Sequence, residues 1–253
     1  MENIEKPLFY SARLKIKRAN QHIQELVRVL HAFPQADVHH IGIEEDAKTA
    51  GSALKLEIAD NILDDIPLII GDAIHNLRTA LDHVAYELVT LSGGTPTYHT
   101  KFTIGETRKE TVTALGGVIQ GVGLDILTCI IEYVQPYRGG NDALYALHTL
   151  DIADKHRLLV PIFTTVEMEI VTRSHGQSFG YLAFVITPSE KTPMIRNFSR
   201  SKIESYSNPM LRVIFEGVEG FKNQPVIPTL LQLSQLVSHT IQIIERAFLD
   251  MRK

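Results

Sequence analysis

The sequence predicts an α+β fold in which a bundle of four to five helices is joined to an antiparallel β-sheet. Segments with apolar residues at helical spacing lie near both ends of the chain and across its middle. Other segments are rich in β-branched and aromatic residues and are separated by turn signals. The chain contains no internal repeat and no low-complexity linker, so we expect residues 1–253 to form a single domain.

The N-terminal part of the chain predicts one helix followed by a hairpin. Apolar residues keep a helical period over 8–33, and Pro34 is expected to end this helix. The strand-rich segment 38–59 follows, and a polar turn divides it into two strands. Apolar residues alternate with other residues in the second strand, so one of its faces is expected to join a core.

The second helix is expected over 65–91, with Gly93 and Gly94 at its end. Its apolar residues are spaced three and four apart, which places them in one stripe along the helix. A stripe of this kind has to pack against other helices. Its members are Ile70, Ile74, Leu77, Leu81, Val84 and Leu88.

Further helices are expected over 122–135, 141–157 and 227–251. The glycine-rich stretch that begins with Gly116 and Gly117 is interpreted as a flexible connection ahead of them.

The segment 159–217 changes to β-branched and aromatic runs that are separated by turn signals. We expect these runs to be antiparallel strands that join the N-terminal hairpin in one sheet.

The composition excludes several classes of protein. The one cysteine, Cys129, excludes a disulfide framework and a zinc site built from cysteines. A net charge of −4 argues against a surface that binds nucleic acid over its whole extent. No apolar run approaches the ~20 residues that a bilayer crossing needs, and the start of the chain lacks the hydrophobic part of a secretory signal. We therefore expect no membrane contact and a cytoplasmic location.

Several well-known site motifs are absent from the sequence. These are the patterns of nucleoside-triphosphate, dinucleotide, zincin and α/β-hydrolase sites. No cofactor is therefore expected.

The polar face of the second helix has an unusual composition. It lies opposite the apolar stripe and contains no lysine, although lysine is common on solvated helix faces. Short polar side chains of this kind suit fixed hydrogen bonds, so the face builds either a buried polar network or a functional site. Its members are Asp72, His75, Asn76, Arg78, Thr79, Asp82, His83 and Tyr86, with Glu87 at its flank.

The segment G-D-A-I-H-N-L-R-T-A-L-D-H, residues 71–83, contains an arginine followed by a histidine with four residues between them. This Arg78-x4-His83 spacing resembles the signature of the HEPN superfamily, a group of helical-bundle proteins of prokaryotic toxin and defence systems. The chain is also similar to a widespread group of bacterial proteins that pair a GDAIHNLRTALDH-like helix with a later LHTLDIADKHR-like helix. The second resemblance identifies no activity. Two features depart from the HEPN pattern, namely Thr79 after the arginine and the long β-rich segments.

The HEPN resemblance implies a metal-independent ribonuclease that works as a homodimer. Arg78 would hold the scissile phosphate of RNA, and His83 would exchange protons with the ribose or the leaving oxygen. The product would be a 2′,3′-cyclic phosphate. At 100° per residue, Arg78 and His83 lie about 140° apart around one straight helix. They therefore need a shared ligand or a second copy of the helix in order to converge.

Two other classes of function stay open. One is a non-catalytic helical bundle that binds a ligand or a partner, in which Arg78 and Asp82, or a histidine and Thr79, form ties between helices. The other is a metal-dependent enzyme, in which the ligands would be His75, Asp82, His148 and Asp151. No Glu-x-x-His pair of a di-iron bundle is present.

The segment 148–157 supplies further candidate polar residues. His148, Asp151 and Lys155 are spaced three and then four apart, so they share one face of a helix. We expect this face to support the polar face of the second helix. The supporting set is His75, Asn76, Thr79, Asp82, His148, Asp151 and Lys155.

Overall fold

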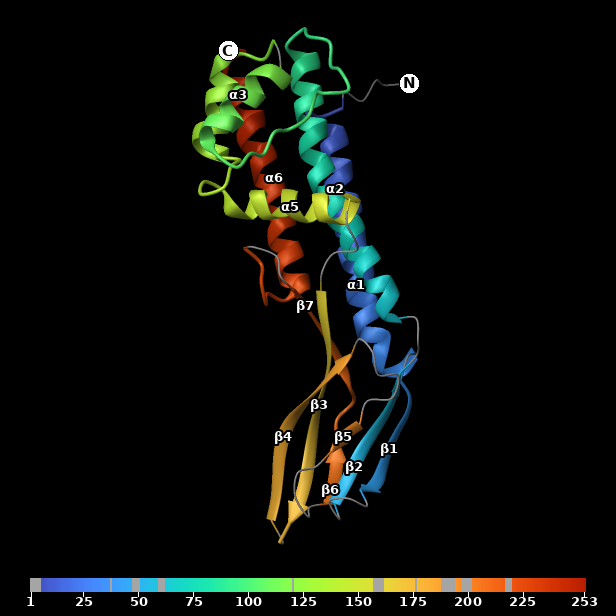
Figure 1. Cartoon of the computed structure of the whole chain (residues 1–253). Helices are drawn as coiled ribbons and strands as arrows, with labels where there is room; N and C mark the ends of the chain where they lie inside the picture. The colour runs from blue at the N-terminus through green and yellow to red at the C-terminus, as the bar shows by residue number, and fades with distance from the viewer. Residues whose placement is uncertain are drawn as a thin grey trace, which may run out of the picture.

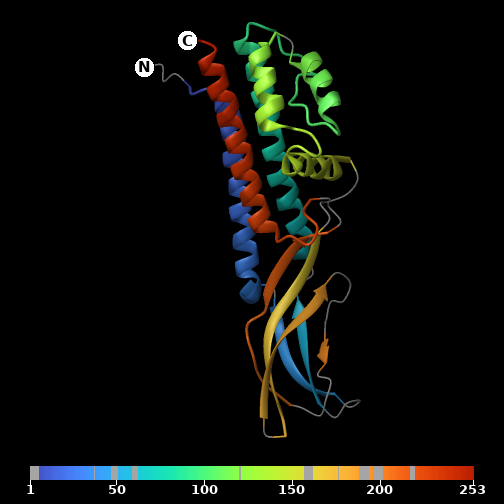
Figure 2. The same cartoon turned by 90° about the vertical axis from the view of Figure 1, so that its left-hand side faces the viewer.

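The computed structural model of the chain describes residues 6–36, 38–46, 51–58, 62–119, 121–156, 162–175, 177–187, 194–196, 202–216 and 220–253. Helices occupy one half of an elongated molecule and strands occupy the other half (Figures 1 and 2). The predicted α+β class is confirmed. Among the described helices, none is both long enough and apolar enough to cross a membrane.

Three long helices run along the axis of the helical half. They are α1 (Tyr10–Ala36), α2 (Ile62–Leu91) and α6 (Val226–Asp250) (Figure 1). The predicted apolar stripe of α2 is confirmed, because each of its six members is fully buried. Burial of one such side chain contributes about 1.5–3 kcal/mol, so this stripe is a major part of the core.

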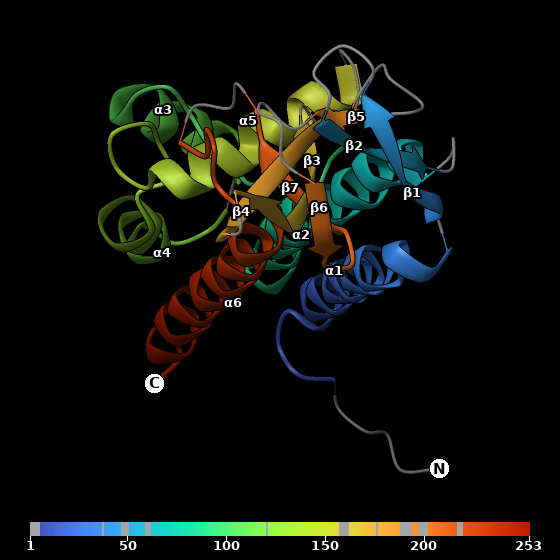
Figure 3. The ribbon, with the colours of Figure 1, turned by 90° about the horizontal axis from the view of Figure 1, so that it is seen from below.

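Shorter helices cover one side of the long ones. They are α3 (Arg108–Val118), α4 (Leu124–Cys129) with the π-helical segment η1 (Ile130–Val134), and α5 (Asp142–His156). Helix α5 crosses α2, and Figure 3 shows α1 and α5 on opposite sides of α2. Polar residues of α2 therefore face two different neighbours.

The predicted helices are confirmed with small shifts of their ends, and α3 is an addition. Helix α1 continues through Pro34 to Ala36, because a proline in the last turn removes only one hydrogen bond. Gly116 and Gly117, expected in a flexible connection, lie in α3. The Thr107 hydroxyl caps this helix by accepting a hydrogen bond from the amide of Glu110.

The close approach of α5 to α2 depends on a glycine. A Cβ atom added to Gly71 would lie 2.5 Å from the Asp154 carboxylate oxygen Oδ1, which is a steric clash. Gly71 thus lets the Asp154 side chain of α5 lie directly on the backbone of α2.

The strands form two antiparallel sheets, whereas one was expected. The N-terminal hairpin, β1 (Val38–Asp46) and β2 (Gly51–Ile58), is confirmed, and it pairs with β5 (Met194–Arg196). The second sheet contains β3 (Ile162–Ser174), β4 (Gln177–Thr187), β6 (Lys202–Tyr206) and β7 (Met210–Phe215).

The long strand β3 is the centre of the second sheet. It pairs with β4 along one edge. On its other edge it pairs with β7 near its start and with β6 near its end. Both edges of β3 are thereby filled, and the hairpin pairs with β5 in a separate sheet.

Candidate functional site

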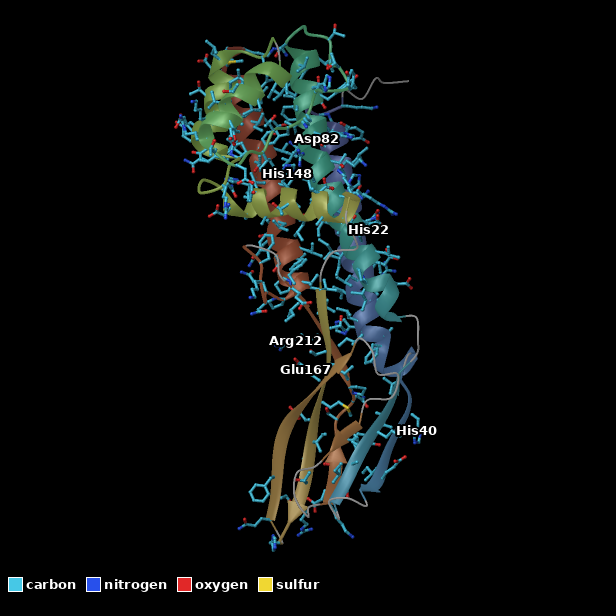
Figure 4. All side chains as sticks on the ribbon, in the orientation of Figure 1. His22, His40, Asp82, His148, Glu167 and Arg212 are labelled. Atoms are coloured by element: carbon cyan, nitrogen blue, oxygen red, sulfur yellow. The ribbon has the colours of Figure 1, made fainter. Side chains whose placement is uncertain are left out.

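Arg78 lies in a closed polar network between α2 and its neighbours. The residue is only 4% exposed. Its guanidinium donates hydrogen bonds to Asp82 Oδ1 at 2.7 Å, to the Phe102 carbonyl at 2.6 Å and to His148 Nδ1 at 3.3 Å. Asp82 Oδ1 also accepts a hydrogen bond from the Phe102 amide at 2.9 Å. These hydrogen bonds connect α2 with α5 and with the segment 92–107. Figure 4 shows Asp82 and His148 in the helical half of the molecule.

His148 is held in its neutral form. Burial, and next the charge of Arg78, lower the pKa of His148 from 6.5 to about 4. Because the Arg78 Nε group can only donate, His148 Nδ1 must accept, and the ring proton lies on Nε2. A neutral His148 therefore completes the Arg78 network at pH 7.

A second network joins α2 to α5 through the buried carboxylate of Asp151. The Asp151 side chain accepts from Lys155 Nζ at 2.6 Å, and its Oδ1 atom lies 2.9 Å from His75 Nδ1. On the other side of the imidazole, Thr79 Oγ1 lies 3.4 Å from His75 Nε2. The order of contacts is Lys155, Asp151, His75 and Thr79.

Asn76 faces α1 and not α5. Its amide nitrogen donates to the Asp72 carbonyl at 2.8 Å, and its Oδ1 atom accepts from Lys15 Nζ at 3.4 Å. Asn76 therefore belongs to the α1–α2 contact.

A cavity of about 650 Å³ lies over the polar face of α2. The surface that lines it is mainly carbon, interrupted by hydroxyl, carboxylate and imidazole groups. Ser11 of α1 and Thr100 of the segment 92–107 contribute to its walls. Helix α2 contributes a run spaced three and four apart, made of Thr79, Asp82, His83, Tyr86, Glu87 and Thr90.

His83 is the imidazole of this cavity. Burial, and next the charge of Lys15, lower the pKa of His83, while Asp82 and Glu87 oppose this change. A lowered pKa leaves the His83 ring neutral at pH 7. The ring can then both donate and accept a hydrogen bond.

The start of α1 is fixed beside the cavity by a strained residue. Phe9 is fully buried and has a φ angle of 55°, which is in the left-handed region. Its amide donates to Glu87 Oε1 at 2.6 Å. A left-handed φ angle at a residue other than glycine costs about 1–3 kcal/mol, which the surrounding structure has to offset. Residues strained in this way are often found at functional sites.

A smaller cavity of about 270 Å³ lies on the other side of the Arg78 network. It is lined by residues of α5 and of the segment before α3, among them His148 and Tyr145. The Tyr145 hydroxyl donates to Glu106 of that segment, a contact that raises the pKa of Tyr145. Ligand sites usually measure about 300–1,000 Å³, so the larger cavity is the stronger candidate.

Arg78 and His83 occupy different surroundings. Arg78 is committed to Asp82, Phe102 and His148 and does not line the larger cavity. His83 lines that cavity on the side of α1. Within one chain the two residues form no common site.

The residues expected to support them divide into separate groups. His148 and Asp82 contact Arg78, whereas His75, Thr79 and Lys155 belong to the Asp151 network. The four expected metal ligands divide into two pairs: His75 contacts Asp151, whereas Asp82 and His148 each contact Arg78. Among the described residues, no three histidine, cysteine or acidic side chains form a group that could hold a metal ion.

Several residues of the site were not among the sequence candidates. Glu87 was expected only at the flank of the polar face and had no role there, although it follows His83 by four residues on the same helix. Ser11, Thr100 and the Phe102 carbonyl carried no such signal, since tertiary packing alone brings them to α2.

Comparisons with protein-family models, curated proteins and solved structures find no match to this chain. The HEPN resemblance consequently depends on the Arg78 and His83 spacing alone.

Proposed function

We propose that the chain binds a small organic ligand in the larger cavity. The observation that carries this proposal is the cavity itself, a space of about 650 Å³ that combines a mainly apolar lining with hydroxyls and His83. Such a lining excludes water from an apolar ligand body, and its few polar groups orient the ligand.

The charges around the cavity favour an uncharged ligand. Asp82 and Glu87 line it and repel anions. Both carboxylates already accept hydrogen bonds from the chain, Asp82 from Arg78 and Glu87 from the Phe9 amide. A neutral molecule that hydrogen-bonds to His83 is therefore the best fit.

Acetophenone is a suitable probe, because it is neutral and aromatic and has one carbonyl acceptor. We expect saturation-transfer NMR to detect its binding to the full chain. Thr90→Trp places a large ring in the cavity and should abolish the signal. Thr113→Trp is the matched control, because Thr113 is likewise an exposed helical threonine bonded to the carbonyl four residues earlier. An equal signal from all three proteins, or none from any, would contradict the proposal.

A metal-independent ribonuclease of the HEPN type is the second candidate function. The observation that favours it is that His83, neutral at pH 7, lines an accessible cavity and can act as a base. In this proposal two copies of the chain form a homodimer, and Arg78 exchanges Asp82 for an RNA phosphate.

The ribonuclease proposal is tested by incubating RNA with the protein in the presence of EDTA. We expect a 2′,3′-cyclic phosphate product and its loss in His83→Gln. His31→Gln, a change at an exposed histidine of α1, is the control and should retain cleavage. Cleavage that is equal in both variants would point to a contaminating nuclease.

A further inference from the structure

Thr79 makes a different contact from most hydroxyl side chains whose hydrogen bonds are described in these helices. A helical threonine or serine commonly donates to the carbonyl four residues earlier. That contact is made here by Thr90, Thr111, Thr113, Thr149, Thr229 and Ser238. Thr79 Oγ1 instead lies 3.4 Å from His75 Nε2.

The Asp151 carboxylate determines which nitrogen of His75 carries the proton. An ionised carboxylate can only accept, so the hydrogen between Asp151 Oδ1 and His75 Nδ1 is on the nitrogen. Lys155 donates to the other oxygen of Asp151 and keeps the carboxylate in place. In a neutral His75 ring, Nε2 then carries a lone pair to which the Thr79 hydroxyl can donate.

This order of contacts is that of an activated nucleophile. The hydroxyl faces a base, the base is oriented by a buried carboxylate, and the threonine is one of the residues that line a cavity of ligand size. The 3.4 Å distance is longer than in a reacting complex, as is common without substrate. His83 lies one helical turn beyond Thr79 on the same cavity, where its ring can donate to a substrate carbonyl.

We propose that Thr79 is a nucleophile activated by His75, with Asp151 as the positioning residue, and that the cavity accepts small neutral carboxylic esters. This inference rests on the proposed ligand-binding function and names the ligand class.

The proposed reaction has two balanced steps. In the first, Thr79 Oγ1 attacks the ester carbonyl carbon, its proton passes to His75 Nε2, and the alcohol leaves with that proton. The enzyme then carries an acyl group on Thr79. In the second step, water attacks the acyl carbon, gives one proton to His75 and releases the carboxylic acid. The proton on His75 returns to Thr79 Oγ1.

The test uses 4-nitrophenyl acetate and the full chain. We expect release of 4-nitrophenolate above the rate in buffer, with one acetyl group found on Thr79 by peptide mass spectrometry. Thr79→Val keeps the shape of the side chain and should reduce the rate to that of buffer, and Thr79→Ser should restore it. His75→Gln should lower kcat about 100-fold, the usual contribution of a general base. Asp151→Asn should lower kcat while KM stays near its original value.

Thr113→Val is the control, because it removes a helical threonine hydroxyl far in sequence from the cavity. It should leave the rate unchanged, and circular dichroism should show the same helix content in all variants. An acetyl group on another residue, or an unchanged rate in Thr79→Val, would overturn the inference. If acetophenone binds and no acetyl-Thr79 forms, the nucleophile proposal fails and ligand binding stands. If acetophenone does not bind either, the proposed function itself fails.

Discussion

The charged guanidinium of Arg78 is buried in the helical half, and each of its three nitrogens donates a hydrogen bond. Removing one member of a buried ion pair usually costs about 3–5 kcal/mol, because the other charge is left without a partner. Asp82 is one-third exposed, so water can screen part of its charge and reduce this cost.

We therefore expect Arg78→Ala to lower the free energy of unfolding by about 2–4 kcal/mol, as measured by urea denaturation. Arg13→Ala is the comparison, because the ion pair of Arg13 with Glu245 is more exposed. That change should cost less than about 1 kcal/mol. Equal losses in the two variants would show that the Arg78 network does not contribute as described.

His148 makes stability depend on pH. The folded protein holds the pKa of His148 at about 4, whereas the unfolded chain binds the proton below about 6.5. The unfolded state therefore binds more protons between these values, and stability is lost as the pH falls through this window. The loss should amount to roughly 2 kcal/mol after allowance for solvent screening of the partly exposed ring.

His148→Asn keeps an acceptor for Arg78 and removes the titrating ring. We expect its free energy of unfolding to fall less than that of the original protein between pH 6.5 and pH 4. His40→Asn, in the exposed part of β1, should behave like the original protein. Parallel curves for all three proteins would rule out His148 as the titrating group.

At the scale of single residues, the sequence predicted which polar side chains belong to the site better than it predicted their hydrogen-bond partners. The Arg78 and Asp82 pair could be foreseen, since the two residues are four apart on one helix. The contacts of Arg78 with His148 and Phe102 could not, because they depend on how α5 and the segment 92–107 fold back onto α2.

At the scale of elements, the crossing of α2 and α5 depends on the missing side chain of Gly71. Alanine favours a helix over glycine by about 1 kcal/mol, but its Cβ atom would meet the Asp154 carboxylate. We expect Gly71→Ala to destabilise the protein in the original background and to stabilise it when combined with Asp154→Ala.

A double-mutant cycle by thermal denaturation measures this coupling. Additive effects of the two changes would mean that the Asp154 carboxylate turns away, or that α5 shifts, at little cost, contrary to the close contact described. The pKa of Asp154 is raised by its burial and by Asp151 and Asp72. Its removal alone should therefore be tolerated at neutral pH.

Elements defined by local signals were predictable, and elements defined by distant pairing were not. The apolar stripe of α2 is a local pattern, and its burial is complete. Helix α3 also has a local signal in the sequence, the Thr-x-x-Glu pattern of a helix start at Thr107 and Glu110. The division of the strands into two sheets had no local signal, because the pairings of β5 with β2, and of β3 with β6 and β7, arise only through the tertiary fold.

At the scale of the whole molecule, helices and strands share one hydrophobic core. Buried residues of α2, such as Ile70, belong to the same cluster as Val166 of β3 and Phe215 of β7. A shared core predicts that both halves unfold together.

We expect hydrogen exchange in increasing urea to give the same midpoint for peptides of α2 and of β3. Mass spectrometry of the two sets of peptides in one experiment supplies an internal control. Two separate midpoints would indicate two folding units and would contradict the prediction of a single domain.

Asp82 lies in the sequence between Arg78 and His83, the two residues of the Arg-x4-His spacing, and its carboxylate forms an ion pair with Arg78. Sorting related sequences by the side chain at this intervening position would separate chains that tie the guanidinium internally from chains that leave it available to an incoming anion. A three-residue pattern of this kind is more informative than the arginine and histidine alone.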